Sequence, residues 1–173
     1  MGDATLPAAD GEAGARKLYQ SAYMQVRELM QTEVVTLAEG DRLDLADTIM
    51  RLGRIRHLPV ISNGRLVGIL SQRDLFRAAI STALHLRPEA EREWLGKIAI
   101  REVMVRPVIT ATPGMSVRQA VGLMLEHKIG CLPVVENGEL VGLVSETDFL
   151  RLLARLLDLA EVRQALPLLQ EGE

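Results

Sequence analysis

Two serines, each followed three residues later by an aspartate, are the residues of this chain best placed to do chemistry. They are Ser71 with Asp74, and Ser145 with Asp148. Each serine stands where an apolar stretch gives way to a helical pattern, and so at a helix N-terminus. Such an end offers backbone N–H groups to a phosphate, and an ionised aspartate can accept hydrogen bonds from both hydroxyls of a ribose diol. The same spacing also predicts a capping box that serves the helix alone.

The two motifs differ in charge. Arg73 lies inside the first, whereas Glu146 and Thr147 fill the same interval of the second. An arginine presents a planar fork to phosphate oxygens, while a glutamate repels them. We therefore expect the first motif to accept a charged ligand, and the second to be weaker, empty or suited to a less charged one.

The motifs belong to an internal repeat. Residues 26–78 align with residues 100–152 at a constant offset of 74, without a gap and with 20 identities in 53 positions. Self-similarity of this kind is the signature of a duplicated structural unit. Two copies of one unit therefore define the architecture.

Each copy begins with the same predicted elements. A short valine-rich strand ends at Thr36 and at Thr110, and a helix follows. In the second copy Ser116 opens that helix, with a glutamine three residues on, which predicts a capping box. In the first copy Asp41 is the expected cap, and Gly53 is the expected residue just after the helix.

The rest of each copy reads as a hairpin and a second helix. Two apolar runs flank Asn63-Gly64 in one copy and Asn137-Gly138 in the other. Asn-Gly between strands is the strongest short hairpin signal, because a type I′ turn needs positive φ at both positions. The second helix starts at the serine of each motif, so the unit is β-α-β-β-α.

The predicted fold class is α+β, or α/β-like, with two such repeats packed through their sheets about a pseudo-twofold axis. One copy alone would be marginal, because a domain of about 60 residues buries only about 60% of its unfolded surface. The expected divisions are a flexible N-terminal tail at 1–20, the first repeat at 21–80, a helical connector at 81–99, the second repeat at 100–157, and a C-terminal helix or tail at 158–173.

These residues resemble a tandem CBS domain pair, or Bateman module, over about residues 24–157. The pattern M-x-x-x-V-x-T, then L-P-V-x-x-N-G-x-L-V-G, then S-x-x-D occurs twice. It comprises Met30, Val34, Thr36, residues 58–68, Ser71 and Asp74, and again Met104, Val108, Thr110, residues 132–142, Ser145 and Asp148.

The resemblance implies a function. Such modules bind adenosine-containing ligands in the cleft between the repeats: AMP, ADP, ATP, S-adenosylmethionine, sometimes NAD or a cyclic dinucleotide. They usually sense rather than catalyse, and two modules commonly form a disc-shaped dimer. We expect a stand-alone, homodimeric regulatory module with no obligatory cofactor, whose ligand is AMP, ADP or ATP and which modulates an unknown protein partner.

The resemblance also assigns residues. It gives the aspartates of both motifs to ribose and the serines to phosphate, and basic residues before the Leu-Pro pair, here Arg56 with His57, to phosphate. The adenine needs an apolar slot with backbone groups at its edge; strand ends and the two Leu-Pro stretches are candidates, although all are also ordinary core residues. The expected ligand-binding set is Thr36, Arg56, His57, Pro59, Ser71, Arg73, Asp74, Thr110, Pro133, Ser145, Thr147 and Asp148.

Other chemistry has little support. The histidines share no metal-ligand spacing, and the single cysteine, Cys131, lies in a predicted core strand, so we expect no metal site and no catalytic residue. A buried small side chain is the expected state of Cys131. No acid–base pair or further nucleophile stands out, which disfavours an enzyme.

Composition narrows the setting. Hydrophobic residues make up 48% of the 173 residues, enough for a core, and the net charge of −3 argues against nucleic acid and anionic membranes as partners. No apolar run approaches the roughly 20 residues of a membrane helix. One cysteine excludes an internal disulfide and favours the cytoplasm. Two alternatives remain open: a ligand-free dimeric scaffold, or a sensor of S-adenosylmethionine, NAD or a cyclic dinucleotide.

Overall fold

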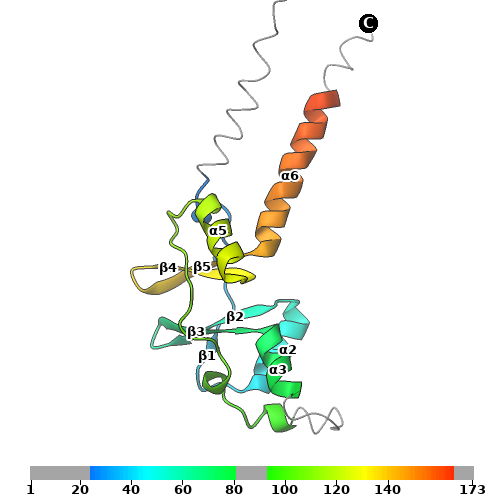
Figure 1. Cartoon of the computed structure of the whole chain (residues 1–173). Coiled ribbons are helices and arrows are strands. Elements are labelled where there is room, and N and C mark those ends of the chain that lie inside the picture. The colour runs from blue at the N-terminus through cyan, green and yellow to red at the C-terminus, as the bar shows by residue number, and fades with distance from the viewer. Residues whose placement is uncertain (1–23, 81–92, 166–173) are drawn as a thin grey trace, which may run out of the picture. The chain divides into compact units, whose positions relative to one another are not determined.

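The computed structural model describes residues 24–80 and 93–165 (Figure 1). The predicted tail at 1–20, the connector as far as residue 92 and the end of the chain after residue 165 lie outside the described residues. The first repeat contains β1 (Leu37–Ala38), α2 (Leu43–Gly53), β2 (His57–Ser62), β3 (Arg65–Ser71) and α3 (Gln72–Ile80). The second contains α5 (Val117–His127), β4 (Cys131–Glu136), β5 (Glu139–Ser145) and α6 (Glu146–Ala165). Short 3-10 turns, η1 (Val26–Glu28) and η2 (Ile100–Glu102), lie at the start of the aligned repeat sequences.

The strands confirm the predicted α+β class. They form one five-stranded sheet in the order β1-β2-β3-β5-β4. β1 runs parallel to β2, and β2 pairs antiparallel with β3. The helices α2 and α3 pack against each other and against these strands. The two motifs begin at the C-terminal ends of β3 and β5. Each of these ends is therefore positioned by the hairpin that precedes it and by the helix that follows it.

The two hairpin turns form as predicted. Asn63 and Gly64 have φ of 50° and 75°, and Asn137 and Gly138 have φ of 53° and 87°. Positive φ at both central positions is the requirement of a type I′ turn, which matches the twist of the flanking strands. Local turn chemistry thus determines the register that carries each serine to the end of its strand.

The first strand of each repeat was predicted wrongly. Val34–Thr36 precede β1, which begins only at Leu37 and pairs with β2 at two positions. In the second repeat residues 108–110 form no strand either. A valine-rich stretch has a high strand propensity, but it becomes a strand only where a partner supplies the ladder.

The first-helix cap is confirmed in one repeat and wrong in the other. Gln119 donates its N–H to Ser116 Oγ at 3.2 Å, and its side chain accepts from the Ser116 N–H at 3.1 Å. In the first repeat the N-cap is Arg42, whose side chain makes no capping bond. The expected cap, Asp41, instead accepts from the Ala38 N–H at 2.8 Å, because it precedes the position equivalent to Ser116 by one residue.

The C-terminal end of that helix also differs from expectation. Gly53 is the last helical residue, and Arg54 takes the left-handed conformation with φ of 51°. Lys128 does the same in the second repeat, with φ of 54°. A cation at the end of a helix interacts favourably with the helix dipole, so both repeats place a basic residue where glycine is more common.

The segments that lead into the repeats are exchanged between them. Leu43 donates its N–H to the Ile98 carbonyl at 3.2 Å, and Val117 donates to the Met24 carbonyl at 2.8 Å. Each contact is the other shifted by 74 residues, with the repeats interchanged. Residues 98–105 therefore complete the first repeat, and residues 24–30 complete the second.

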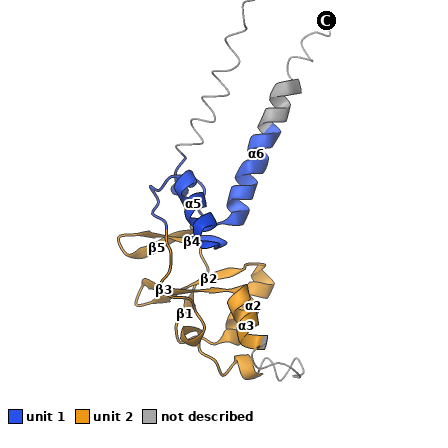
Figure 2. Cartoon of the chain, in the orientation of Figure 1, with its two compact units in different colours: residues 1–30, 111–132, 144–173 blue, residues 31–110, 133–143 orange. Residues whose placement is uncertain are grey.

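This exchange explains the two compact units of the chain, which cut across the repeats (Figure 2). One unit holds residues 1–30, 111–132 and 144–173, and the other holds residues 31–110 and 133–143. The second unit has a buried core in which Leu37, Leu43, Leu58, Val60 and Leu70 are at most 1% exposed. Residues 98–106, which we call the crossing segment, contribute Ile100 to that core.

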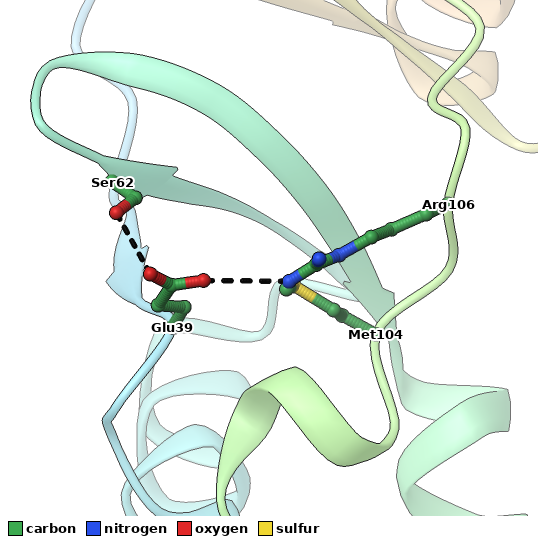
Figure 3. Close-up of polar contacts among 4 residues, drawn as sticks. All are labelled: Glu39, Ser62, Met104 and Arg106. Atoms are coloured by element: carbon green, nitrogen blue, oxygen red, sulfur yellow. Dashed lines mark hydrogen bonds and ion pairs between the residues drawn. The ribbon is translucent and has the colours of Figure 1, made fainter.

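Polar contacts fasten the crossing segment to the first repeat (Figure 3). The Glu39 carboxylate accepts from Ser62 Oγ at 2.9 Å and, through its other oxygen, from Arg106 Nη2 at 3.4 Å. Nearby, the Met104 side chain packs against the backbone of Gly68 so closely that a methyl group there would overlap it. The glycine is required by this approach.

Candidate functional site

The first motif forms a complete capping box and leaves one oxygen over. Ser71 ends β3, and Asp74 lies in the first turn of α3. Asp74 donates its N–H to Ser71 Oγ at 3.2 Å, while the Ser71 N–H, at 3.0 Å, and hydroxyl both donate to Asp74 Oδ2. Among the described residues nothing bonds to Asp74 Oδ1, and the side chain is half-buried. That oxygen can accept a hydrogen bond from a ligand without loss of the cap.

The second motif has no such oxygen. Ser145 donates its N–H and its hydroxyl to Asp148 Oδ2 at 2.8 and 2.7 Å. Arg151, one turn further along α6, donates from Nη1 to Asp148 Oδ1 at 3.2 Å. Asp148 is only 5% exposed. Both carboxylate oxygens are therefore engaged within the protein.

The structure brings the basic stretch before the first Leu-Pro pair to the same place. His57 stands opposite Ser71 in the β2–β3 register, and the Gln72 N–H donates to the Arg56 carbonyl at 2.9 Å. Arg56 and Arg73 are exposed, and neither forms an ion pair with a described residue. The N-terminus of α3 thus stands beside two unpaired cations.

The corresponding place in the second repeat lacks these basic side chains. The Glu146 N–H donates to the Gly130 carbonyl at 3.0 Å, so Cys131 takes the position of His57. The Cys131 thiol is 3% exposed, which confirms its predicted burial. Burial, and then the charge of Glu146, raise its pKa from 9.0 to about 12. The sulfur is therefore a neutral thiol at physiological pH and supplies no nucleophile.

A pocket of about 350 Å³ opens beside the end of α2 and the start of α3. Its walls include Arg51, Arg54 and Arg56, with Asp47 as the single acid; the other lining residues are Met50, Ile55, Gln72 and Leu75. None of the three arginines forms an ion pair with a described residue. Arg56 thus also lines an arginine-rich pocket, whose lining does not include Ser71 or Asp74.

The candidate adenine contacts lie at the strand ends. Thr36 is half-buried and adjoins Pro59, since the next residues of the two parallel strands pair. Pro59 is fully buried, and β1 pairs with β2 only beyond it. Pro133 is also fully buried, and it lies on β4, an edge strand of the sheet. Thr110 is half-buried, seven residues before α5 begins. The prolines can therefore offer a ligand only backbone acceptors.

Sequence reasoning missed Arg151. It aligns with Arg77, one of the identities between the repeats, yet only Arg151 pairs with the aspartate of its motif. An arginine three residues after an aspartate on a helix is a signal for a pair, but that signal is the same in both repeats. Thr147, within the second motif, is half-buried.

Residues 24–80 and 93–165 contain neither a metal-binding cluster nor a membrane-spanning helix. No group of histidine, cysteine, aspartate and glutamate there could hold a metal ion. No helix in those ranges combines the length and hydropathy needed to cross a membrane.

The fold and the paired motifs define a tandem-repeat α+β module with a serine–aspartate pair at each strand-to-helix junction. The family model described as the CBS domain matches residues 26–81 and again residues 100–155. The chain therefore belongs to the CBS domain family and carries two CBS domains in tandem.

Curated relatives support this. The chain is 35% identical over 133 residues to an uncharacterised protein, MJ1225, of Methanocaldococcus jannaschii, covering 75% of this chain and 47% of that protein. It is 31% identical over 123 residues to the CBS domain-containing protein YhcV of Bacillus subtilis, covering 71% of this chain and 81% of that protein. The chain thus spans about half the length of the first relative and most of the second.

Solved structures show the same fold. The CBS domain pair of MJ0100, in complex with 5′-methylthioadenosine and S-adenosylmethionine, matches with a TM-score of 0.65 and 27% identity, over 76% of this chain and 97% of that one. The CBS domain of a membrane protein from Sphaerobacter thermophilus matches with a TM-score of 0.64 and 32% identity, over 82% of this chain and 95% of that one.

Proposed function

We propose that this chain is a regulatory module that binds an adenine nucleotide, AMP, ADP or ATP, at its first repeat. The observation that carries the proposal is the carboxylate of Asp74, which caps α3 through one oxygen and leaves the other for a ligand hydroxyl. Two exposed arginines, Arg56 and Arg73, flank the same helix N-terminus. The adenosyl ligands of MJ0100 are further support for a ligand of this class.

Each group has a proposed role. Asp74 accepts from the ribose diol, and Ser71 and the first N–H groups of α3 face the phosphate. Arg56 and His57 neutralise the phosphate charge, with Arg73 beside them. Thr36 and the Pro59 backbone border the adenine. The motif of the second repeat is the weaker site because it lacks these cations.

Sensing requires that the ligand favour one state of the module over another, since a ligand shifts an equilibrium only by its differential affinity for the states. We propose that nucleotide binding changes the geometry of a homodimer and thereby the activity of a protein partner in the cytoplasm. Sedimentation of the purified chain with and without nucleotide tests the dimer directly.

The binding proposal is tested by calorimetry with AMP, ADP, ATP, S-adenosylmethionine, NAD and cyclic di-AMP. Asp74→Ala removes a charge-assisted acceptor worth about 1.5–3 kcal/mol, so the affinity of an adenine nucleotide should fall by roughly ten- to a hundredfold. Asp148→Ala should change it far less. Because Asp74→Ala also removes a cap, Gln119→Ala, which opens a capping box on another helix, is the matched control and should bind normally.

One observation favours a second candidate, a ligand-free interaction scaffold. Ser71 and Asp74 already satisfy each other in three hydrogen bonds, which is all that helix capping requires. The scaffold predicts an intact dimer and no heat from any compound of the panel. A nucleotide that binds equally well to Asp74→Ala and to the unsubstituted protein would also remove the ribose role and leave the cap.

A further inference from the structure

The equivalent carboxylates of the two repeats have different partners, and one difference is whether the arginine three residues later bonds to them. In the second repeat both oxygens of Asp148 are bonded, Oδ2 to Ser145 and Oδ1 to Arg151. In the first repeat Arg77 stands at the position equivalent to Arg151, but it forms no ion pair with Asp74. Both carboxylate oxygens are thus bonded in the second motif, whereas only one is bonded in the first.

We propose that Arg151 blocks ligand binding at the motif of the second repeat, and we call it the guard residue. Its guanidinium occupies the carboxylate oxygen that a ribose diol would need, so the module binds one nucleotide per chain, in the first repeat. This inference rests on the proposed function and adds the stoichiometry of binding and a residue that limits it, beside the missing cations. The ligands that Arg151 excludes from the second repeat are nucleosides and nucleotides with an intact vicinal diol.

The difference in exposure between the two side chains allows Arg151 to be displaced from Asp148. The side chain of Asp148 is 6% exposed and that of Arg151 is 61% exposed. The arginine can therefore leave into solvent without disturbing the core, whereas the aspartate cannot turn away from it. Hydrogen bonds to charged groups are stronger than neutral ones and compete directly for the same lone pairs. A diol has to displace Arg151 before it can bind Asp148.

The experiment is calorimetric titration of AMP and of S-adenosylmethionine, both of which carry the diol. The unsubstituted chain should bind one equivalent. Arg151→Ala should bind two, with the affinity of the second site raised at least about tenfold, the effect of one charge-assisted hydrogen bond. Arg77→Ala is the matched control, an exposed arginine at the equivalent position without an ion pair, and it should still bind one.

Two further arms assign the sites. Asp74→Asn in the Arg151→Ala background should leave one equivalent, because only the second repeat then retains its carboxylate. The 2′,3′-dideoxy analogue of AMP, which lacks the diol, should show no second site in Arg151→Ala. Circular dichroism verifies that each variant is folded.

The outcomes separate the inference from the function on which it rests. One equivalent in both the unsubstituted chain and Arg151→Ala, lost on Asp74→Asn, would overturn the guard and keep the nucleotide site. Two equivalents in the unsubstituted chain would do the same. Absence of heat from both ligands with every variant would overturn the proposed function, and the guard with it.

Discussion

The buried thiol of Cys131 should make the protein lose stability in alkaline solution in a way that one substitution removes. Its pKa is raised from 9.0 to about 12, first by burial and then by the charge of Glu146. The folded state therefore holds its proton more tightly than the unfolded state does. The corresponding stability is fully present below about pH 9 and is lost as the pH rises from about 9 to about 12.

The size of the effect follows from the shift. Each unit of pH between the two pKa values costs about 1.4 kcal/mol at full slope. At about pH 10 the unfolded thiol is mostly ionised and the folded one is not, so the free energy of unfolding should be about 1.4 kcal/mol lower than at pH 7 from this group alone. A loss of that size is readily measured by urea denaturation followed by circular dichroism.

The matched control is Cys131→Ala, which deletes the titrating group. Its smaller side chain lowers stability at every pH, while lysines and tyrosines titrate alike in both proteins, so the difference between the two pH profiles isolates the thiol. The profile of the unsubstituted protein should fall more steeply above about pH 9. Parallel profiles up to about pH 10 would refute the argument that this sulfur is desolvated.

Three other outcomes are expected. Gly68→Ala should lower the free energy of unfolding by about 1–3 kcal/mol, because its methyl group overlaps Met104; Gly122→Ala, with open space on α5, should instead raise it by about 0.5–1 kcal/mol, and equal effects in denaturation would contradict the packing. Ser116→Ala should cost about 1 kcal/mol by loss of the α5 cap, visible in the same assay. Arg56→Ala should weaken binding of AMP but not of adenosine, and should flatten the salt dependence of AMP affinity; equal loss for both ligands would exclude a phosphate role.

Much of this protein is encoded locally and can be read from sequence. The Asn-Gly turns adopt positive φ because their own residue types tolerate it, and Ser116 caps α5 through a contact only three residues long. The serine–aspartate motifs stand at strand-to-helix junctions for the same reason. The constant offset of 74 establishes the duplication without any coordinates. Such features depend on neighbours along the chain, so the chain alone determines them.

Other features depend on distant partners, and only the tertiary structure decided them. Val34–Thr36 have strand-forming residues but no strand opposite them. The exchange of the leading segments rests on hydrogen bonds such as that from Leu43 to Ile98, between residues 55 positions apart. Neither the missing strand nor the exchange can be read from composition or hydrophobic periodicity. Backbone hydrogen bonds between segments form only when folding brings a partner segment alongside.

The clearest example of a feature decided by the tertiary structure is the pair of arginines that follow the two motifs by about one helical turn. Arg77 and Arg151 are identical in type, spacing and repeat position, so the sequence by itself does not distinguish them. The structure forms it once, onto a carboxylate that is 6% exposed. Whether two charges three residues apart meet depends on how far the surrounding core removes one of them from water. That environment is a property of the fold, and it distinguishes two aspartate–arginine pairs that have the same spacing in the sequence.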